Sequence, residues 1–241
     1  MASIKRLIRR SLWRLGCDVR RLNLTESRWI QLVVQLRAHD INTVIDIGAN
    51  VGQFAEGLRD AGFRGRIISF EASRAAHCEL QHRAMHDRRW TVAPRLAIGG
   101  SDGKTKINVS ANSVSSSILP MLPTHLVAEP KSTYIRTETV ELRRLDTVAD
   151  EYLSEDDHVF LKSDTQGMEF EVLRGAGRLL DRITGLQVEL SLIPLYEGEH
   201  LFETMICEIR DRGFELWSLV PGFADKNNGR LLQVDGIFFR R

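Results

Sequence analysis

The sequence has few cysteines and almost no net charge. Only three of its 241 residues are cysteines (Cys17, Cys78 and Cys207), and none of them forms a Cys-x-x-Cys pair. This argues against a disulfide scaffold and a cysteine zinc site, and it indicates a reducing compartment. We therefore expect a cytoplasmic protein. The net charge of +1 gives no general electrostatic reason to bind nucleic acid.

Long apolar runs are also missing. The longest stretch without Asp, Glu, Lys or Arg, residues 107–128, is rich in serine and contains Pro120 and Pro123, so it is too polar for a bilayer. The N-terminus lacks the apolar core of a secretory signal. The length and the 43% hydrophobic content suffice for one sizeable core, and a single α/β domain is expected.

Residues 1–21 carry the strongest local charge, with seven Lys or Arg residues against the single acid Asp18. Apolar residues at helical spacing give this segment one apolar face. Such a helix can lie on an anionic membrane, at its inner face, or pack against the domain or a second copy in a homodimer. Packing is favoured, because amphipathic helices usually face a core. We divide the chain into a basic helical segment, 1–40, and a main domain, 41–241.

The most informative stretch runs from Thr43 to Phe54. A β-branched run ends at Gly48, and a helical pattern starts a few residues later. The spacing of Asp46, Gly48 and Gly52 is acid-x-Gly-x-x-x-Gly, which lacks the third glycine of the dinucleotide-binding fingerprint. An acid at the strand end suits a cofactor with a positive amine and no phosphate, as in S-adenosylmethionine. An ordinary turn without a ligand is the alternative.

A second strand, 66–70, ends in Glu71 about 20 residues further on, where nucleoside-binding α/β folds place the acid that binds the ribose. Strands are also expected at 90–98, 159–164 and 186–190, with helices between them, which predicts parallel βαβ units. Strands at 214–220 and 236–240 predict an antiparallel hairpin, and strands at 105–109 and 137–142 can pair. Residues 108–130 read as a long loop.

Four acids, Asp46, Glu71, Asp164 and Glu189, lie at or near the carboxyl ends of the expected parallel strands. Ligands of open α/β sheets bind at this edge. Because buried carboxylates are costly unless they are paired or used, this convergence predicts a binding site.

Two segments resemble the FkbM family of S-adenosylmethionine-dependent methyltransferases: 46–54 (DIGANVGQF) and 161–169 (LKSDTQGME). Shorter matches, at 172–176 and 234–238 among others, extend the resemblance over about residues 42–240. The resemblance implies a class I methyltransferase fold, Rossmann-like α/β. Its seven-stranded, mostly parallel sheet would end in a C-terminal antiparallel β-hairpin, with helices on both faces. Ala72 and Ser163 depart from the family pattern, but neither departure removes a functional group.

The resemblance also implies roles for the matched positions. The methionine part of the cofactor would lie against Asp46, Gly48, Asn50, Gly52 and the adjoining Gln53. Glu71 would bind both ribose hydroxyls, Ala97 and Ile98 would flank the adenine, and Asp164 would lie beside the methyl group and the acceptor. The implied reaction is O-methylation of a hydroxyl on a sugar, a glycolipid, a polysaccharide or a polyketide-type product.

Methyl transfer to a hydroxyl benefits from a general base, for which Asp164 and Glu189 are the first choices and His125 the third. Asp164 and Glu189 can alternatively hold a divalent metal, but no third ligand is evident, so we predict no metal site.

The competing functions are methylation of a macrolide-like or other small-molecule hydroxyl, and a catalytically silent domain that binds the cofactor and a partner. A nicotinamide enzyme is disfavoured by the missing glycine, and nucleic-acid methylation by the lack of an Asn-Pro-Pro-aromatic motif. Acceptor specificity is expected in the loops 108–130 and 191–200.

Overall fold

The computed structural model describes residues 11–14, 16 and 27–240. The predicted amphipathic helix at 1–21 lies outside the described residues, except for a helical turn at 11–14. Among the described residues, no helix combines the length and the apolar character needed to cross a bilayer.

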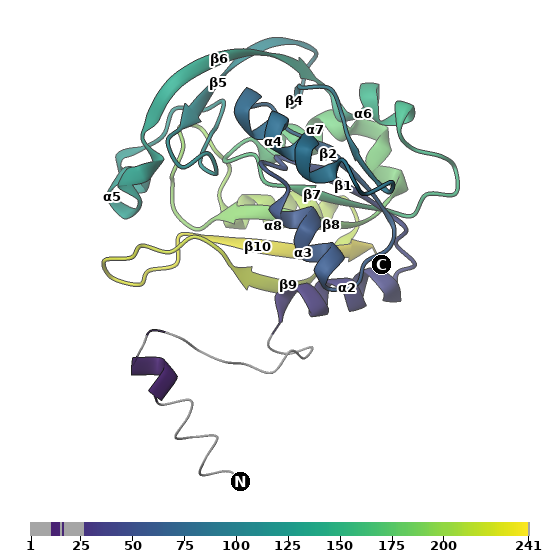
Figure 1. Ribbon diagram of the computed structural model, residues 1–241, viewed down its shortest axis with the longest axis horizontal. Helices are drawn as coiled ribbons and strands as arrows, with labels where there is room; N and C mark the ends of the chain where they lie inside the picture. The colour runs from purple at the N-terminus through teal and green to yellow at the C-terminus, as the bar shows by residue number, and fades with distance from the viewer. Residues whose placement is uncertain (1–10, 15, 17–26, 241) are drawn as a thin grey trace.

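A seven-stranded sheet forms the centre of the molecule, with the strand order β3-β2-β1-β7-β8-β10-β9 (Figure 1). The first five strands pair in parallel, and β10 pairs antiparallel with both β8 and β9. The expected fold, including the C-terminal hairpin, is therefore confirmed. The strands are β1 (Thr43–Ile47), β2 (Arg66–Phe70), β3 (Trp90–Val92), β7 (Val159–Ser163), β8 (Ile183–Ser191), β9 (Phe214–Pro221) and β10 (Gln233–Arg240).

Helices cover both faces of this sheet, because alternate strand residues point to opposite sides. Val44 and Phe160 pack under one helical layer, whereas Ile45 and Leu161 pack under the other. The first layer contains α2 (Arg28–Ala38), α3 (Gln53–Asp60) and α4 (Arg74–Ala84). The second contains α6 (Leu145–Val148), α7 (Glu169–Ala176) and α8 (Phe202–Asp211), with the short 3₁₀ helices η2 (Ala149–Glu151) and η3 (Gly177–Arg182).

A separate three-stranded sheet contains β4 (Ala97–Ile98), β5 (Gly103–Ser110) and β6 (Tyr134–Arg143), and it lies beside the main sheet (Figure 1). β5 and β6 pair antiparallel, as expected. The single strand expected at 90–98 is wrong: it divides into β3 and β4, which join different sheets. Pro94, which has no N–H to donate, lies in the break. The long loop also contains α5 (Pro123–Ala128), followed by η1 (Pro130–Ser132).

The turns that follow β1 and β7 are in close contact at Gly48. Its backbone is left-handed, with φ +71°, and a Cβ atom there would lie 1.8 Å from the carbonyl oxygen of Asp164. The N–H of Asp164 in turn donates to the carbonyl of Ile47. Glycine is therefore required both by the backbone conformation and by the space available. It allows the two segments that carry the site to meet.

Substituting Gly48 with Ala is expected to destabilise the protein more than Gly229→Ala does. Gly229 has a similar φ of +76° but open space around its Cα. The control therefore measures the conformational cost alone, about 1–2 kcal/mol, to which the clash at Gly48 adds about 1–3 kcal/mol. Chemical denaturation of both variants measures the difference. Equal free energies of unfolding would contradict the proposed contact.

Candidate functional site

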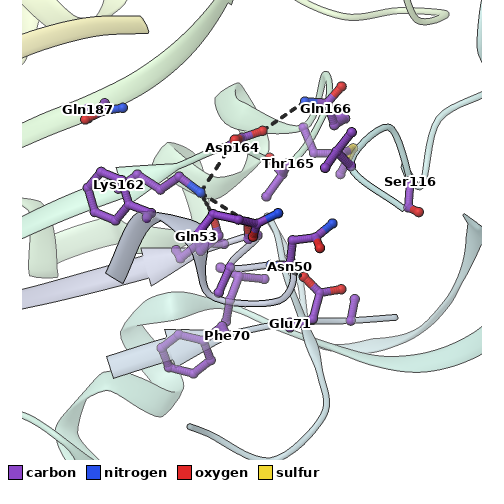
Figure 2. Close-up of a pocket in the computed structure, with 18 of the residues that line it drawn as sticks. Asn50, Gln53, Phe70, Glu71, Ser116, Lys162, Asp164, Thr165, Gln166 and Gln187 are labelled. Atoms are coloured by element: carbon purple, nitrogen blue, oxygen red, sulfur yellow. Dashed lines mark hydrogen bonds and ion pairs between the residues drawn. The ribbon is translucent and has the colours of Figure 1, made fainter. Parts of the chain in front are cut away.

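One continuous pocket lies at the carboxyl ends of β1, β2 and β7, on the face of the sheet that α2 and α3 cover. Figure 2 shows Asn50 and Glu71 on one side of this pocket and Gln187 on the opposite side, with Lys162 and Asp164 between them. We call the side of Glu71 the nucleoside half and the side of Gln187 the acceptor half.

The carboxylate of Glu71 is held in place by two backbone donors. Oε2 accepts from the N–H of Asn50 at 2.8 Å, and Oε1 accepts from the N–H of Ser73 at 2.7 Å. Burial raises the pKa of Glu71, while these backbone hydrogen bonds counteract the shift. A carboxylate has about four acceptor positions, so each oxygen can still accept a bond from a ligand hydroxyl.

Apolar side chains and several serines line the rest of the nucleoside half. Phe70 and residues 96–98 form one wall, and residues 116–118 of the long loop form another. The loop is joined to the turn after β1, because the Asn50 amide donates to the Ser113 hydroxyl at 3.3 Å. Ala97 and Ile98 thus line the pocket with Gly48, Asn50 and Gln53.

Beneath the pocket, Asp46 and Lys162 form a buried ion pair. Nζ of Lys162 lies 3.1 Å from Oδ1 of Asp46, whose side chain is fully buried. The same ammonium group lies 3.6 Å from Oδ2 of Asp164 and donates to the carbonyl of Gly48 at 3.1 Å. Burial raises the pKa of Asp46, and Lys162 opposes that shift. Burial alone would lower the pKa of Lys162, but Asp46 and Asp164 raise it above its ordinary value.

Gln166 connects the two predicted bases, Asp164 and Glu189. Its Nε2 donates to Oδ1 of Asp164 at 2.9 Å and to Oε2 of Glu189 at 2.7 Å. The side-chain oxygen of Gln166 accepts from the hydroxyl of Tyr196, and its backbone is left-handed, with φ +58°. This uncommon conformation for a residue other than glycine is maintained by the surrounding hydrogen bonds.

The acceptor half combines two aromatic rings with polar side chains. The rings of Trp29 on α2 and Phe54 on α3 lie 5.7 Å apart. Gln187 of β8 and Asp235 of β10 provide an amide and a carboxylate, and Ile237 adds an apolar contact. Gln187 and Asp235 face the same side of the sheet as Lys162. Lys162 is paired with Gln187, and Asp235 is paired with Glu189, which lies two residues further along β8.

Some predicted site residues do not line the pocket. Asp46 lies beneath it, and Gly52 packs against the ring of Trp90, where a Cβ atom would approach to 2.6 Å. Glu189 lies behind Gln166. Of the two loops in which acceptor specificity is expected, residues 113, 114 and 116–118 of the first line the nucleoside half, and none of residues 191–200 lines the pocket.

His125 lies apart from the other candidates. It is almost fully buried, its Nδ1 lies 3.2 Å from the sulfur of Met121, and its ring packs against Tyr196 and Phe223. Burial lowers its pKa to about 4, so the ring is neutral at pH 7. It is a core residue and not the solvated loop histidine that isolated histidines often are.

No group of three or more His, Cys, Asp or Glu side chains is arranged to hold a metal ion in the part of the chain that the structure describes. The polar groups of the pocket satisfy one another through amides and the Lys162 ammonium instead.

Several pocket residues have no counterpart in the sequence-based site, among them Lys162, Gln166 and Asp235. Lys162 had a visible signal, since a lysine inside the apolar strand 159–163 requires a buried partner. Gln166 and Asp235 had weaker signals in the sequence, because the residues that they contact are brought near them only by the pairing of distant strands.

The comparisons with known proteins agree with this architecture. The model of the methyltransferase FkbM domain matches residues 46–216. A provisionally assigned methyltransferase from Thermobifida fusca YX is 13% identical over 88% of this chain and 79% of its own, with a TM-score of 0.51. At this identity, the likeness shows the fold alone.

Two further solved structures are similar to the chain at a lower TM-score of 0.46. Precorrin-6y C5,15-methyltransferase from Geobacter metallireducens GS-15 is 13% identical and covers 93% of each chain. Fibrillarin from Aeropyrum pernix, solved with natively bound S-adenosyl-L-methionine, is 11% identical over 82% of this chain and 66% of its own. Among curated proteins, no sequence matches.

Replacing Lys162 with Met is expected to cost about 3–5 kcal/mol of stability, because it leaves the carboxylate of Asp46 buried without its cation. The double variant Asp46→Asn/Lys162→Met should recover much of this loss, since it removes both charges. Chemical denaturation of the two single variants and the double variant measures the coupling. Arg83→Met, at the exposed Glu79 pair on α4, is the control and should cost at most about 1 kcal/mol. Strictly additive effects of the Asp46 and Lys162 substitutions would contradict the coupling.

Proposed function

The chain belongs to the FkbM family of methyltransferases, which makes it an S-adenosylmethionine-dependent methyltransferase, and we propose that its acceptor is a hydroxyl of a sugar, a glycolipid or a polysaccharide. The observation that carries the proposal is the composition of the acceptor half. Trp29 and Phe54 offer aromatic surface, and Gln187 and Asp235 offer hydrogen-bonding groups beside it. A sugar ring presents apolar C–H faces and a rim of hydroxyls, and both match this lining.

The nucleoside half fits the cofactor of this family. Glu71 retains acceptor positions for two hydroxyls, and the apolar side chains of Phe70, Leu96 and Ile98 that line the same half suit a base. Gly48 lets the turn after β1 pack directly against the backbone of Asp164, which brings both segments to the pocket. The carboxylate of Asp164 lines the pocket between the two halves, and it is suited to a positively charged group.

When bound, S-adenosylmethionine supplies a methyl group on a sulfonium leaving group. The remaining work falls to the protein, which must hold the acceptor oxygen in line with that methyl group. Such positioning contributes up to about 7–11 kcal/mol in ideal cases. We assign the orientation of the acceptor to the aromatic pair Trp29 and Phe54 together with Asp164.

Two alternatives differ in the acceptor or in the class of function. A macrolide-like or other small-molecule hydroxyl would use the aromatic rings but fewer of the polar groups. A silent cofactor-binding domain would not need the acceptor half at all. Contact of residues 1–21 with a membrane, and a homodimer, remain proposals that this site does not address.

Glu71→Gln is expected to raise the Kd for S-adenosylmethionine about 10–100-fold. The substitution places an amide N–H₂ against the backbone donors and removes an acceptor for the ribose. Isothermal titration calorimetry measures the change, with Glu79→Gln on the exposed face of α4 as the control. An unchanged Kd for the Glu71 variant would remove Glu71 from the cofactor site.

The acceptor can be tested with S-adenosylmethionine that carries a tritium-labelled methyl group. The assay measures transfer of the label to a panel of methyl glycosides, glycolipids and macrolide alcohols. We expect labelled O-methyl products from the glycosides or glycolipids and the same rate with a chelator present. Labelling of the macrolide alcohols alone would favour the small-molecule alternative. Cofactor binding without transfer to any acceptor would favour the silent domain.

A further inference from the structure

The pocket contains one carboxylate that the sequence did not single out, Asp235. It lies near the start of β10, an antiparallel strand, and therefore reaches the same edge of the sheet as the carboxyl ends of β7 and β8. Asp235 lines the acceptor half together with Gln187 and Ile237. We compared it with each other carboxylate of the site as a proton acceptor.

Glu71 and Asp164 also line the pocket, but their oxygens are already engaged. Both oxygens of Glu71 accept backbone N–H bonds in the nucleoside half. Oδ1 of Asp164 accepts from Gln166, and its Oδ2 faces the ammonium group of Lys162. Glu71 is thus held in the nucleoside half, and Asp164 is held between Gln166 and Lys162, whereas Asp235 lies in the acceptor half itself.

Glu189 is the directly opposite cross-strand partner of Asp235 on β8. It does not line the pocket, and its Oε2 accepts from the amides of both Gln166 and Gln233. Burial raises the pKa of Glu189 well above its usual range, and the carboxylates of Asp164, Glu169 and Asp235 add to the shift. Facing carboxylates disfavour double ionisation, so this environment favours the protonated form of Glu189.

We propose that Asp235 is the catalytic residue that takes the proton from the acceptor hydroxyl. The inference rests on the proposed O-methylation. In the step, the acceptor oxygen forms its bond to the methyl carbon while the carbon–sulfur bond breaks. The hydroxyl proton moves to the carboxylate of Asp235, and the electron pair of the broken bond stays on sulfur, leaving a neutral thioether. No metal, oxidant or further reactant is needed to balance this step.

Charged and polar groups reach Asp235 from α2, from β7 and the turn after it, and from β8, whereas its partner on β9 is the apolar Val220. Lys162 lies on β7 and Asp164 directly after it, Gln187 and Glu189 lie on β8, and Arg28 lies on α2. Burial raises the pKa of Asp235 to about 6, Asp164 adds to the shift, and Lys162, Gln187 and Arg28 oppose it. The group is therefore ionised at pH 7 and is a stronger base than an exposed aspartate.

The test compares Asp235→Asn, Asp235→Glu and Glu189→Gln in the methyl glycoside assay. We expect Asp235→Asn to lower kcat about 10²–10⁴-fold with an unchanged Kd for S-adenosylmethionine, and Asp235→Glu to retain part of the activity. Calorimetric titration of the cofactor into each variant shows that the fold and the nucleoside half are intact.

The pH profile provides a readout that a purely structural role would not produce. Because the base must be deprotonated, wild-type kcat/KM should fall as the pH drops below about 6. In Asp235→Asn the inflection near pH 6 should vanish, and the residual rate should rise with hydroxide concentration across the whole pH range.

If the wild-type protein transfers the methyl group normally, three results would overturn the inference. The first is a kcat of Asp235→Asn within about threefold of wild type, and the second is loss of cofactor binding in that variant. The third is a large loss of kcat in Glu189→Gln but not in Asp235→Asn. A wild-type protein that binds the cofactor but methylates no hydroxyl in the panel would instead contradict the proposed function, and this inference with it.

Discussion

The site depends on one buried ion pair, Asp46 with Lys162. Two charges below an apolar helical layer are costly to desolvate, and they are tolerated only because each has a partner at close range. The Lys162 ammonium also binds the carbonyl of Gly48 and faces Asp164, so one group fixes the cofactor turn relative to the neighbouring strand. The nucleoside and acceptor halves of the pocket are thereby held at a fixed separation.

Much of this architecture is visible in local patterns. The β-branched runs, the glycine after β1 and the acids at strand ends predict the parallel sheet and its ligand-binding edge, because each depends on neighbouring residues. The antiparallel hairpin and the pairing of β5 with β6 follow from alternation. The error at 90–98 came from treating an apolar run as one strand, although Pro94 interrupts its hydrogen bonding.

The parts that escaped prediction depend on register between distant strands. Asp235 reaches the pocket because β10 runs antiparallel, so its first residues, and not its last, meet the carboxyl ends of β7 and β8. Gln166 joins Asp164 to Glu189 only once those two strands are neighbours. His125 shows the converse, since the sequence does not reveal that its loop is folded into a core.

The two halves of the pocket come from different lengths of the chain. Residues 47–118 supply most of the nucleoside half, whereas the acceptor half also takes Trp29 from α2, Val220 from β9 and Asp235 from β10. Substitutions at Trp29 or Val220, near the two ends of the gene, can therefore alter the acceptor surface without changing a residue of the nucleoside half. In this arrangement, a change of acceptor and retention of the cofactor require substitutions and constancy at largely different codons.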